Sequence, residues 1–232
     1  MTVAEHSPSL ADGDFVELSY TARLADNGRV IDTTDPAVAK DADIADVTAT
    51  GPCVVVLGEG HLFDVVEEAI KGTDVGDAGR VFVDSGDAFG EVDPTAGATI
   101  DIEHIPVEQR TPGVQVWYKG RSGFVESTDE ESARVNFNHL LAGSAIEYEF
   151  TVYRQVTSLD EQIDGLLSLY GLTETIDARL ETEGTNRVLV PDVTDPTEAV
   201  DSWETRKQQV LTDFRADLPL DGVRITERYP FP

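Results

Sequence analysis

A short glycine-bounded helix in the first third of the chain most constrains its fold. Residues 58–76 have the sequence GEGHLFDVVEEAIKGTDVG, in which a glycine-containing turn leads into the helix and Gly72 ends it. The apolar residues of this segment share one helical face: Leu62, Val65, Val66 and Ala69. The sequence therefore predicts a short helix with one buried face, followed by a turn and a further strand.

Strand signals surround this helix. Residues 16–24 alternate apolar and polar side chains, a pattern typical of a half-buried strand. A hairpin turn is predicted at Asp26, Asn27 and Gly28, because Asn and Gly tolerate positive φ. Further strands are predicted at 54–57, 80–83 and 98–105. Residues 33–51 are rich in Asp, Ala and Thr and predict an exposed loop or bulge.

Apolar strands also occupy the middle of the chain. The Thr-Pro-Gly sequence at 111–113 interrupts the first series of strands, and short strands are predicted after it at 114–118, 123–125 and 134–137. A clear alternation then returns over 146–152. The fold class is therefore α+β, a curved antiparallel sheet wrapped on one helix, with a small β insert before its last strand.

The character of the chain changes after residue 156. Ser158 and Glu161 have the spacing of a capping box and predict the start of a helix. Apolar residues predict a second amphipathic helix between 200 and 214, and short strands at 188–190 and 223–225. We interpret residues 158–232 as a separate small α/β domain.

The charge of the chain is extreme. It has 17 Lys and Arg residues against 45 Asp and Glu residues, a formal net charge of −28. Such a surface repels nucleic-acid phosphates and anionic membranes. At about 1 M salt the Debye length falls to about 3 Å, so most self-repulsion is screened. We expect a protein from a halophilic archaeon with a salty cytoplasm; the alternative is an ordinary acidic protein.

Few features favour a membrane, an export signal or a metal. Cys53 is the only cysteine, so no disulfide forms within the chain. Residues 1–14 lack the apolar stretch of a signal peptide, and no run approaches a membrane span. The four histidines are scattered singly. We therefore expect a cytoplasmic protein with no cofactor and no metal.

Six segments, in order, resemble the pocket segments of the FKBP family of peptidyl-prolyl cis-trans isomerases. They begin with VELSYTARL at 16–24 and VIDTT at 30–34, continue through 52–58 and the helix, and end with DAFG at 87–90 and YEFTV at 148–152. The resemblance implies catalytic roles for four residues: Tyr20, Asp32, Phe89 and Tyr148. It implies substrate-binding roles for five more: Ile31, Cys53, Leu62, Phe63 and Val66.

The insert has a family counterpart too. Residues 135–143, VNFNHLLAG, resemble the segment that ends the insert-in-flap chaperone module of SlyD-type FKBPs, with Leu140 where proline is usual. The resemblance implies an isomerase domain over 1–109 and 142–157 and a chaperone domain over 110–141. The expected chaperone surface comprises Val116, Tyr118, Phe124, Leu140 and Leu141. The C-terminal part resembles the extension of long archaeal FKBPs.

This resemblance implies an isomerase and folding chaperone whose partners are unfolded or proline-containing polypeptides. X–Pro bonds exchange between cis and trans in tens to hundreds of seconds, and their rotation needs neither a nucleophile nor a metal. An apolar pocket disfavours the planar amide relative to the less polar twisted one. Phe89 replaces a tyrosine of the family pattern and lacks its hydroxyl, so we expect weaker substrate anchoring.

Other interpretations stay open at this stage. Each apolar residue of the predicted pocket, taken alone, fits an ordinary core position. Asp84-Ser85-Gly86 resembles one half of an aspartic protease site, but that chemistry needs two carboxylates sharing a proton. The main alternative is a non-enzymatic holdase chaperone with a weak or silent pocket. The two apolar helix faces of the C-terminal part would also suit a homodimer.

Overall fold

The computed structural model describes residues 9–44, 51–173, 176–183, 186–194 and 200–228. The chain forms two compact units. The first comprises Met1–Arg23, Arg29–Val81 and Glu147–Pro232, and the second comprises Leu24–Gly28 and Phe82–Ile146. Both contain antiparallel sheets and few helices, so the mixed α+β class is confirmed.

The first sheet carries the strands predicted around the glycine-bounded helix. Its strands run in the order β2-β1-β9-β4, with β3 paired to β1. Their bounds are Phe15–Leu24 for β1, Val30–Thr33 for β2, Cys53–Val56 for β3, Ala78–Val83 for β4 and Ile146–Gln155 for β9. On β1 the apolar alternation holds, since Val16, Leu18 and Ala22 are fully buried.

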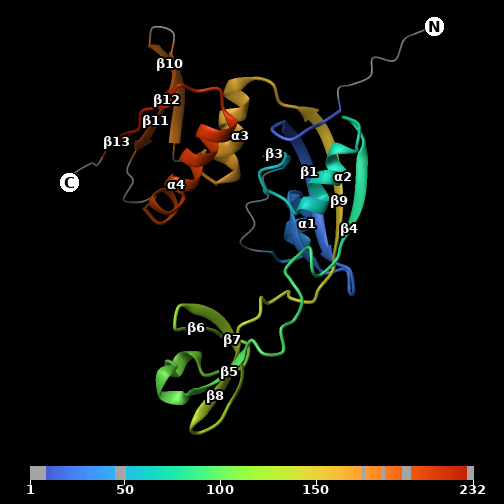
Figure 1. Cartoon of the computed structure of the whole chain (residues 1–232), viewed down its shortest axis with the longest axis vertical. Coiled ribbons are helices and arrows are strands. Elements are labelled where there is room, and N and C mark those ends of the chain that lie inside the picture. The colour runs from blue at the N-terminus through green and yellow to red at the C-terminus, as the bar shows by residue number, and fades with distance from the viewer. Residues whose placement is uncertain (1–8, 45–50, 174–175, 184–185, 195–199, 229–232) are drawn as a thin grey trace. The chain divides into compact units, whose positions relative to one another are not determined.

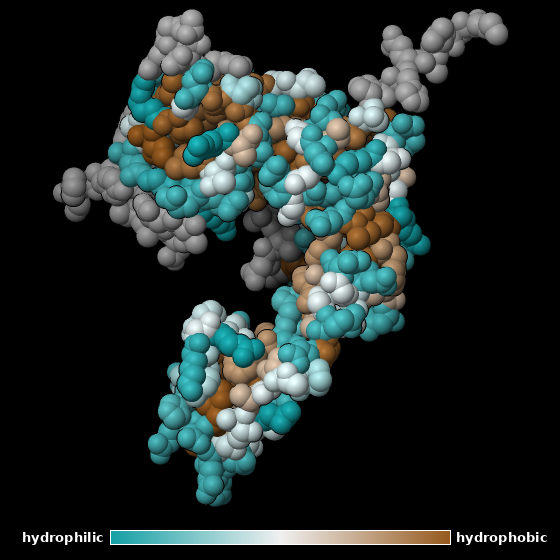
Figure 2. Space-filling view, viewed as in Figure 1, coloured by the Kyte–Doolittle hydropathy of each residue, from teal (hydrophilic) through white to brown (hydrophobic). Residues whose placement is uncertain are grey.

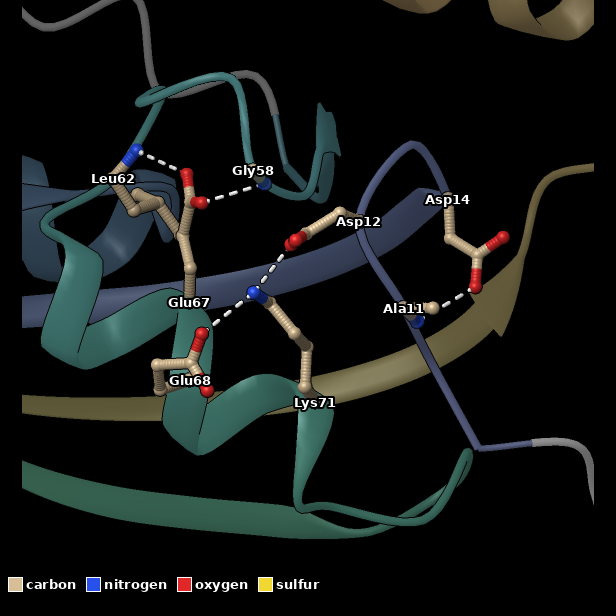
Figure 3. A network of polar contacts seen from close by, with 8 residues as sticks. All are labelled: Ala11, Asp12, Asp14, Gly58, Leu62, Glu67, Glu68 and Lys71. Atoms are coloured by element: carbon tan, nitrogen blue, oxygen red, sulfur yellow. Dashed lines mark hydrogen bonds and ion pairs between the residues drawn. The ribbon is translucent and has the colours of Figure 1, made fainter.

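The glycine-bounded helix is α2, Asp64–Lys71, and it lies across this sheet (Figures 1 and 3). Val66 of the predicted apolar face is fully buried, as is Ile70, which the prediction did not include. Leu62, Val65 and Ala69 are half-buried. Gly72 is its C-cap, as predicted. The predicted turn at Gly28 is also present, and Gly28 has a φ of 71°.

A second helix in this unit differs from the expectation of an exposed loop at 33–51. Residues Pro36–Asp41 form α1, and the Asp35 carboxylate caps it by accepting from the backbone N–H groups of Ala37 and Val38. Proline at the first helical position suits this start, because its missing N–H would have no partner there. Residues 45–50 of the expected loop lie outside the described part of the chain.

The C-terminal part contains two helices and a sheet with both strand directions. The helices are α3, Leu159–Leu169, and α4, Val200–Asp217. The strands are β10 (Ile176–Glu183), β11 (Asn186–Thr194), β12 (Gly222–Val223) and β13 (Thr226–Arg228), of which β12 and β13 pair in parallel with β11. Sequence analysis missed β10 and predicted only the centre of β11.

One buried core joins the C-terminal part to the first sheet. Phe15 and Val56 belong to the same apolar cluster as Leu166 of α3 and Phe214 of α4. The helix faces that suggested a dimer therefore pack within the chain itself. Helix α3 begins where the capping box was predicted, but Ser158 makes no side-chain cap. Glu161 instead accepts from the Arg154 guanidinium at 3.0 and 3.1 Å.

The second unit is built on a four-stranded antiparallel sheet in the order β5-β8-β7-β6. The strands are β5 (Gly97–Asp101), β6 (Gln115–Tyr118), β7 (Arg121–Thr128) and β8 (Ser132–Asn136), with short 3₁₀ turns η1 (Ile102–His104) and η2 (Val107–Gln109) after β5. The strand predicted at 98–105 thus ends at Asp101, and it pairs with β8. The sequence predicted this strand but not its partner.

Hydrophilic residues dominate the visible face of both units, with hydrophobic residues gathered in smaller patches (Figure 2). This surface agrees with the large excess of acidic residues. Within the described residues, no helix is long and apolar enough to cross a membrane.

Candidate functional site

Tyr20 and Asp32 form a hydrogen-bonded pair on adjacent strands. Antiparallel pairing places Ala22 of β1 opposite Asp32 of β2, so residues near these positions share one edge of the sheet. The Tyr20 hydroxyl donates to Asp32 Oδ2 at 2.7 Å. Burial, together with the Asp32 charge, raises the pKa of Tyr20 far above its ordinary value. Tyr20 therefore stays a hydrogen-bond donor throughout the neutral range.

Three aromatic rings meet beside this pair. The ring centroid of Tyr148, on β9, lies 5.7 Å from that of Tyr20 and 6.1 Å from that of Phe63. Phe63 meets Tyr148 edge to face, at an interplanar angle of 85°, an arrangement that aromatic pairs favour. Tyr148 is 5% exposed, and burial raises its pKa. The sheet and the start of α2 thus supply one aromatic cluster.

Cys53 belongs to the same neighbourhood. Burial raises the pKa of its thiol to about 11, and the negative charge of Asp32 contributes. The thiol is therefore neutral at physiological pH and behaves as a small apolar group. Only the thiolate form of a cysteine is nucleophilic. The neutral Cys53 thiol therefore contributes an apolar surface to this neighbourhood.

The structure thus brings together five of the nine residues predicted for the isomerase site: Tyr20, Asp32, Cys53, Phe63 and Tyr148. Val66 is fully buried on α2, while Ile31 and Leu62 are half-buried on β2 and before α2.

Phe89 lies in the second unit, where its ring stacks on His139. The two centroids are 4.4 Å apart and the rings are nearly parallel, at 14°. The backbone N–H of Leu141 donates to His139 Nδ1 at 3.2 Å, which requires Nδ1 to be unprotonated. The backbone N–H of Gly143 also donates to the Gly90 carbonyl at 2.7 Å. These contacts join the turn of Phe89 to the end of the insert.

The glycine turn before α2 is held from two sides. The Glu67 carboxylate accepts from the backbone N–H of Gly58 at 2.7 Å and of Leu62 at 3.3 Å (Figure 3). His61 Nδ1 accepts from the backbone N–H of Val56 at 3.1 Å. Sequence analysis missed Glu67; the available signal was a carboxylate beside Val66 and Ile70 on the apolar face of the helix.

The expected chaperone surface needs one correction. Val116 is 3% exposed and belongs to the core of the insert, together with Val125 and Val135. Because side chains alternate along β6, its neighbour Trp117 faces outward and is 72% exposed. Leu140 is 68% exposed, as a surface role requires. The remaining members of the predicted surface, Tyr118, Phe124 and Leu141, are half-buried.

A hollow of about 650 Å³ lies on the opposite side of the first sheet. Ser19, Thr21, Thr151 and Tyr153 line it, and these positions alternate with Tyr20 and Tyr148 along β1 and β9. The hollow is therefore not the aromatic cluster, although backbone near Tyr20 borders both. Polar and apolar groups share its lining about equally, and Ser19 Oγ lies 2.9 Å from the Tyr153 hydroxyl.

Metal chemistry finds no support in the described ranges. Residues 9–44, 51–173, 176–183, 186–194 and 200–228 contain no group of three or more His, Cys, Asp or Glu side chains that could hold a metal ion.

Comparison with known proteins agrees with this site. Residues 7–110 match the sequence profile of the FKBP-type peptidyl-prolyl cis-trans isomerases. A short-type peptidyl-prolyl cis-trans isomerase from Methanocaldococcus jannaschii is 26% identical over 148 residues, which cover 60% of this chain and 90% of that relative. The chain is therefore similar to the FKBP-type peptidyl-prolyl cis-trans isomerases over residues 7–110, and this match includes Tyr20, Asp32, Cys53 and Phe63.

Proposed function

We propose that this chain accelerates cis-trans rotation of X–Pro bonds in proteins at the cluster of Tyr20, Phe63 and Tyr148, and that its insert binds unfolded segments of the same substrates. The observation that carries the catalytic part is the Tyr20–Asp32 hydrogen bond beside the three rings. The VNFNHLLAG segment at 135–143 supports a SlyD-like subtype with a chaperone insert.

Apolar walls suit this reaction because of the amide's electronic structure. A planar peptide bond is held by resonance, with a barrier of about 18–20 kcal/mol to rotation. Twisting removes the resonance and makes the group less polar, so a water-poor aromatic surface favours the twisted form over the planar one. Only interactions that are stronger in the transition state than in the ground state accelerate the chemical step.

The Tyr20–Asp32 pair supplies a fixed polar edge to this apolar site. Because the Tyr20 proton is committed to Asp32 Oδ2, the phenol ring keeps one orientation against Tyr148. The Asp32 carboxylate, with its second oxygen, can meet a substrate group as the imide turns. A fixed orientation of this kind lowers the cost of reorganisation when the substrate twists.

The direct test is catalysis of a proline-limited reaction. Isomerisation of a short proline peptide is followed in high salt with and without the protein, alongside proline-limited refolding of an unrelated protein. Acceleration by substoichiometric enzyme in both assays is the expected result. Acceleration that needs excess protein, with no effect on the peptide, would instead establish a holdase.

One observation on the second unit favours the holdase alternative. Five large apolar side chains of the second unit are more than half exposed: Phe82, Val92, Val107, Trp117 and Leu140. Exposed apolar groups of this kind bind apolar segments of unfolded chains. We therefore assign holding to the insert and rotation to the aromatic cluster.

A further inference from the structure

We infer that Glu67 is a positioning residue for the isomerase site: its buried carboxylate fixes the backbone just before Phe63, and so sets where that ring meets Tyr148. This role rests on the proposed catalysis at the aromatic cluster. The Glu67 carboxylate acts on the site through backbone, since it accepts from the N–H of Leu62, the residue before Phe63.

The burial of Glu67 needs an explanation, because the residue is only 3% exposed. A buried carboxylate is unfavourable unless charge-assisted hydrogen bonds compensate it. Here two backbone N–H groups do so, from Gly58 and Leu62, one to each carboxylate oxygen (Figure 3). An apolar residue would fill the same space without the cost of burying a charge. The contribution specific to the carboxylate is therefore its two hydrogen bonds to the turn.

These contacts act on the segment that carries Phe63. Phe63 is the N-cap of α2 and has no side-chain cap. Its carbonyl accepts from the N–H groups of Val66 and Glu67, at 2.8 and 3.0 Å. On the other side, the N–H of Leu62 donates to the Glu67 carboxylate. The backbone is thus held both immediately before and immediately after the Phe63 side chain.

The turn itself is built on two glycines, and it is tied by Glu67 in addition to the contact between His61 and Val56. Gly58 and Gly60 adopt φ values of 89° and 72°, a region open mainly to glycine. Glycine loses more conformational entropy on folding than any other residue. A hydrogen bond from outside the turn therefore helps to hold it in one geometry. Glu67 supplies it by reaching back from the end of the first turn of the helix, one position later than the usual capping-box acid.

Glu68 provides a matched control on the same helix. Its side chain is 73% exposed and bonds Lys71 at 2.7 Å, away from the turn (Figure 3). Glu67→Gln removes one charge and replaces one acceptor oxygen by an N–H₂ donor, so only one turn N–H keeps its partner. Glu68→Gln makes the same chemical change without touching the turn.

The experiment measures kcat and KM for a short proline peptide, and amide hydrogen exchange at Gly58 and Leu62, in both full-length variants. We expect Glu67→Gln to lose roughly tenfold in kcat/KM, chiefly in kcat, because small displacements at a site lower the rate more than the affinity. Exchange at both amides should accelerate. Glu68→Gln should stay within about twofold of the parent.

Other outcomes overturn the inference. Equal losses in the two glutamine variants would mean that charge, and not the turn, matters. A lower melting temperature for Glu67→Gln with unchanged kinetics and exchange would leave Glu67 as structural support alone. Should Glu67→Gln fail to fold, Glu67→Asp decides: its shorter carboxylate keeps the charge but cannot reach both N–H groups, and unchanged exchange would refute the role. An inactive parent enzyme would refute the proposed function, while the exchange measurement would still judge Glu67.

Discussion

Gly165 of α3 lies so close to Val54 of β3 that a Cβ at position 165 would be 2.7 Å from the Val54 Cβ. Real Cβ atoms do not approach that closely, so this contact admits no side chain at 165 without movement. The helix and strand share the core that contains Val56 and Leu166. The C-terminal part is therefore packed directly against the strand that leads into the glycine turn.

This contact predicts that replacing the helical Gly165 by alanine lowers the free energy of unfolding, the reverse of the usual effect. Gly→Ala within a helix normally stabilises by about 1 kcal/mol. Gly165→Ala should instead lower the free energy of unfolding by about 1–3 kcal/mol, as overpacking does. Denaturant unfolding measures it. Val54→Gly removes the Cβ and both methyl groups that would clash, and in that background the same Gly165→Ala change should be neutral or stabilising; equal destabilisation in both backgrounds would contradict the contact.

The Tyr20–Asp32 hydrogen bond predicts a loss of catalysis without loss of fold. Tyr20→Phe keeps the ring against Tyr148 but removes the donor, so kcat/KM for a proline peptide should fall about two- to tenfold, the range of one hydrogen bond. Thr21→Val, on the opposite face of β1, is the control and should leave the rate unchanged. Equal rates for Tyr20→Phe and the parent would remove the polar edge from the mechanism.

The same tyrosines predict alkaline destabilisation. Burial raises the pKa of Tyr20 and of Tyr148, so the folded protein keeps both phenols protonated while the unfolded chain ionises them near pH 10. Stability from this source is fully present below pH about 10 and is lost as the pH rises above it. Tyr20→Phe should flatten the decline of the unfolding free energy above pH about 10. An unchanged slope would contradict a buried phenol.

The insert predicts a division of labour between two substrates. Gly97 pairs with Asn136 at the base of the insert sheet, so their Cα atoms are about 4.5–5.5 Å apart and a short glycine linker can replace 97–136. This deletion should spare isomerisation of a short peptide and slow refolding of a protein substrate. Removing only 110–141 would leave β5 without its partner β8.

A point variant tests the exposed surface of the insert itself. Trp117→Ser combined with Leu140→Ser should weaken binding of an unfolded protein, measured by suppression of its aggregation, with little change in melting temperature. Both side chains are largely exposed, so little core packing is lost. Glu130→Ser, in the exposed turn between β7 and β8, serves as the control. Unchanged suppression in the double variant would contradict the holding role.

Sequence patterns predicted the local elements well and their partners poorly. Alternation was enough for β1 and glycines were enough for α2, because both signals are local. The pairing of β5 with β8 depends on residues 35 positions apart, and Val116 and Trp117 are equally apolar, so the sequence could not say which one faces the core. Sequence analysis missed the helix that follows Asp35, because the segment is rich in Ala, Asp and Thr and predicts a loop. The Tyr20–Asp32 pair came from family resemblance, which encodes tertiary contact.

His61 predicts a loss of stability on mild acidification. Burial lowers the pKa of His61, and its Nδ1 accepts from the N–H of Val56, a bond that protonation breaks. The unfolded chain takes up the proton near pH 6.5, so stability is lost as the pH falls below that value. Asp217, whose pKa burial raises to about 6, changes stability in the opposite sense. Comparison with His61→Asn therefore isolates the histidine: the variant should lose less stability than the parent between pH about 7 and 5.5.

The excess of acidic residues predicts that this fold needs salt. With a net charge of −28, self-repulsion favours the expanded chain in dilute buffer, and screening at about 1 M salt removes most of it. The melting temperature should therefore rise from dilute buffer to molar KCl. Because salts also strengthen apolar burial, KCl is compared with an equal ionic strength of NaCl and with sucrose, which is uncharged. A melting temperature no higher in molar KCl than in dilute buffer would reject a halophilic origin, whereas equal gains in salt and sucrose would assign the effect to burial and not to charge.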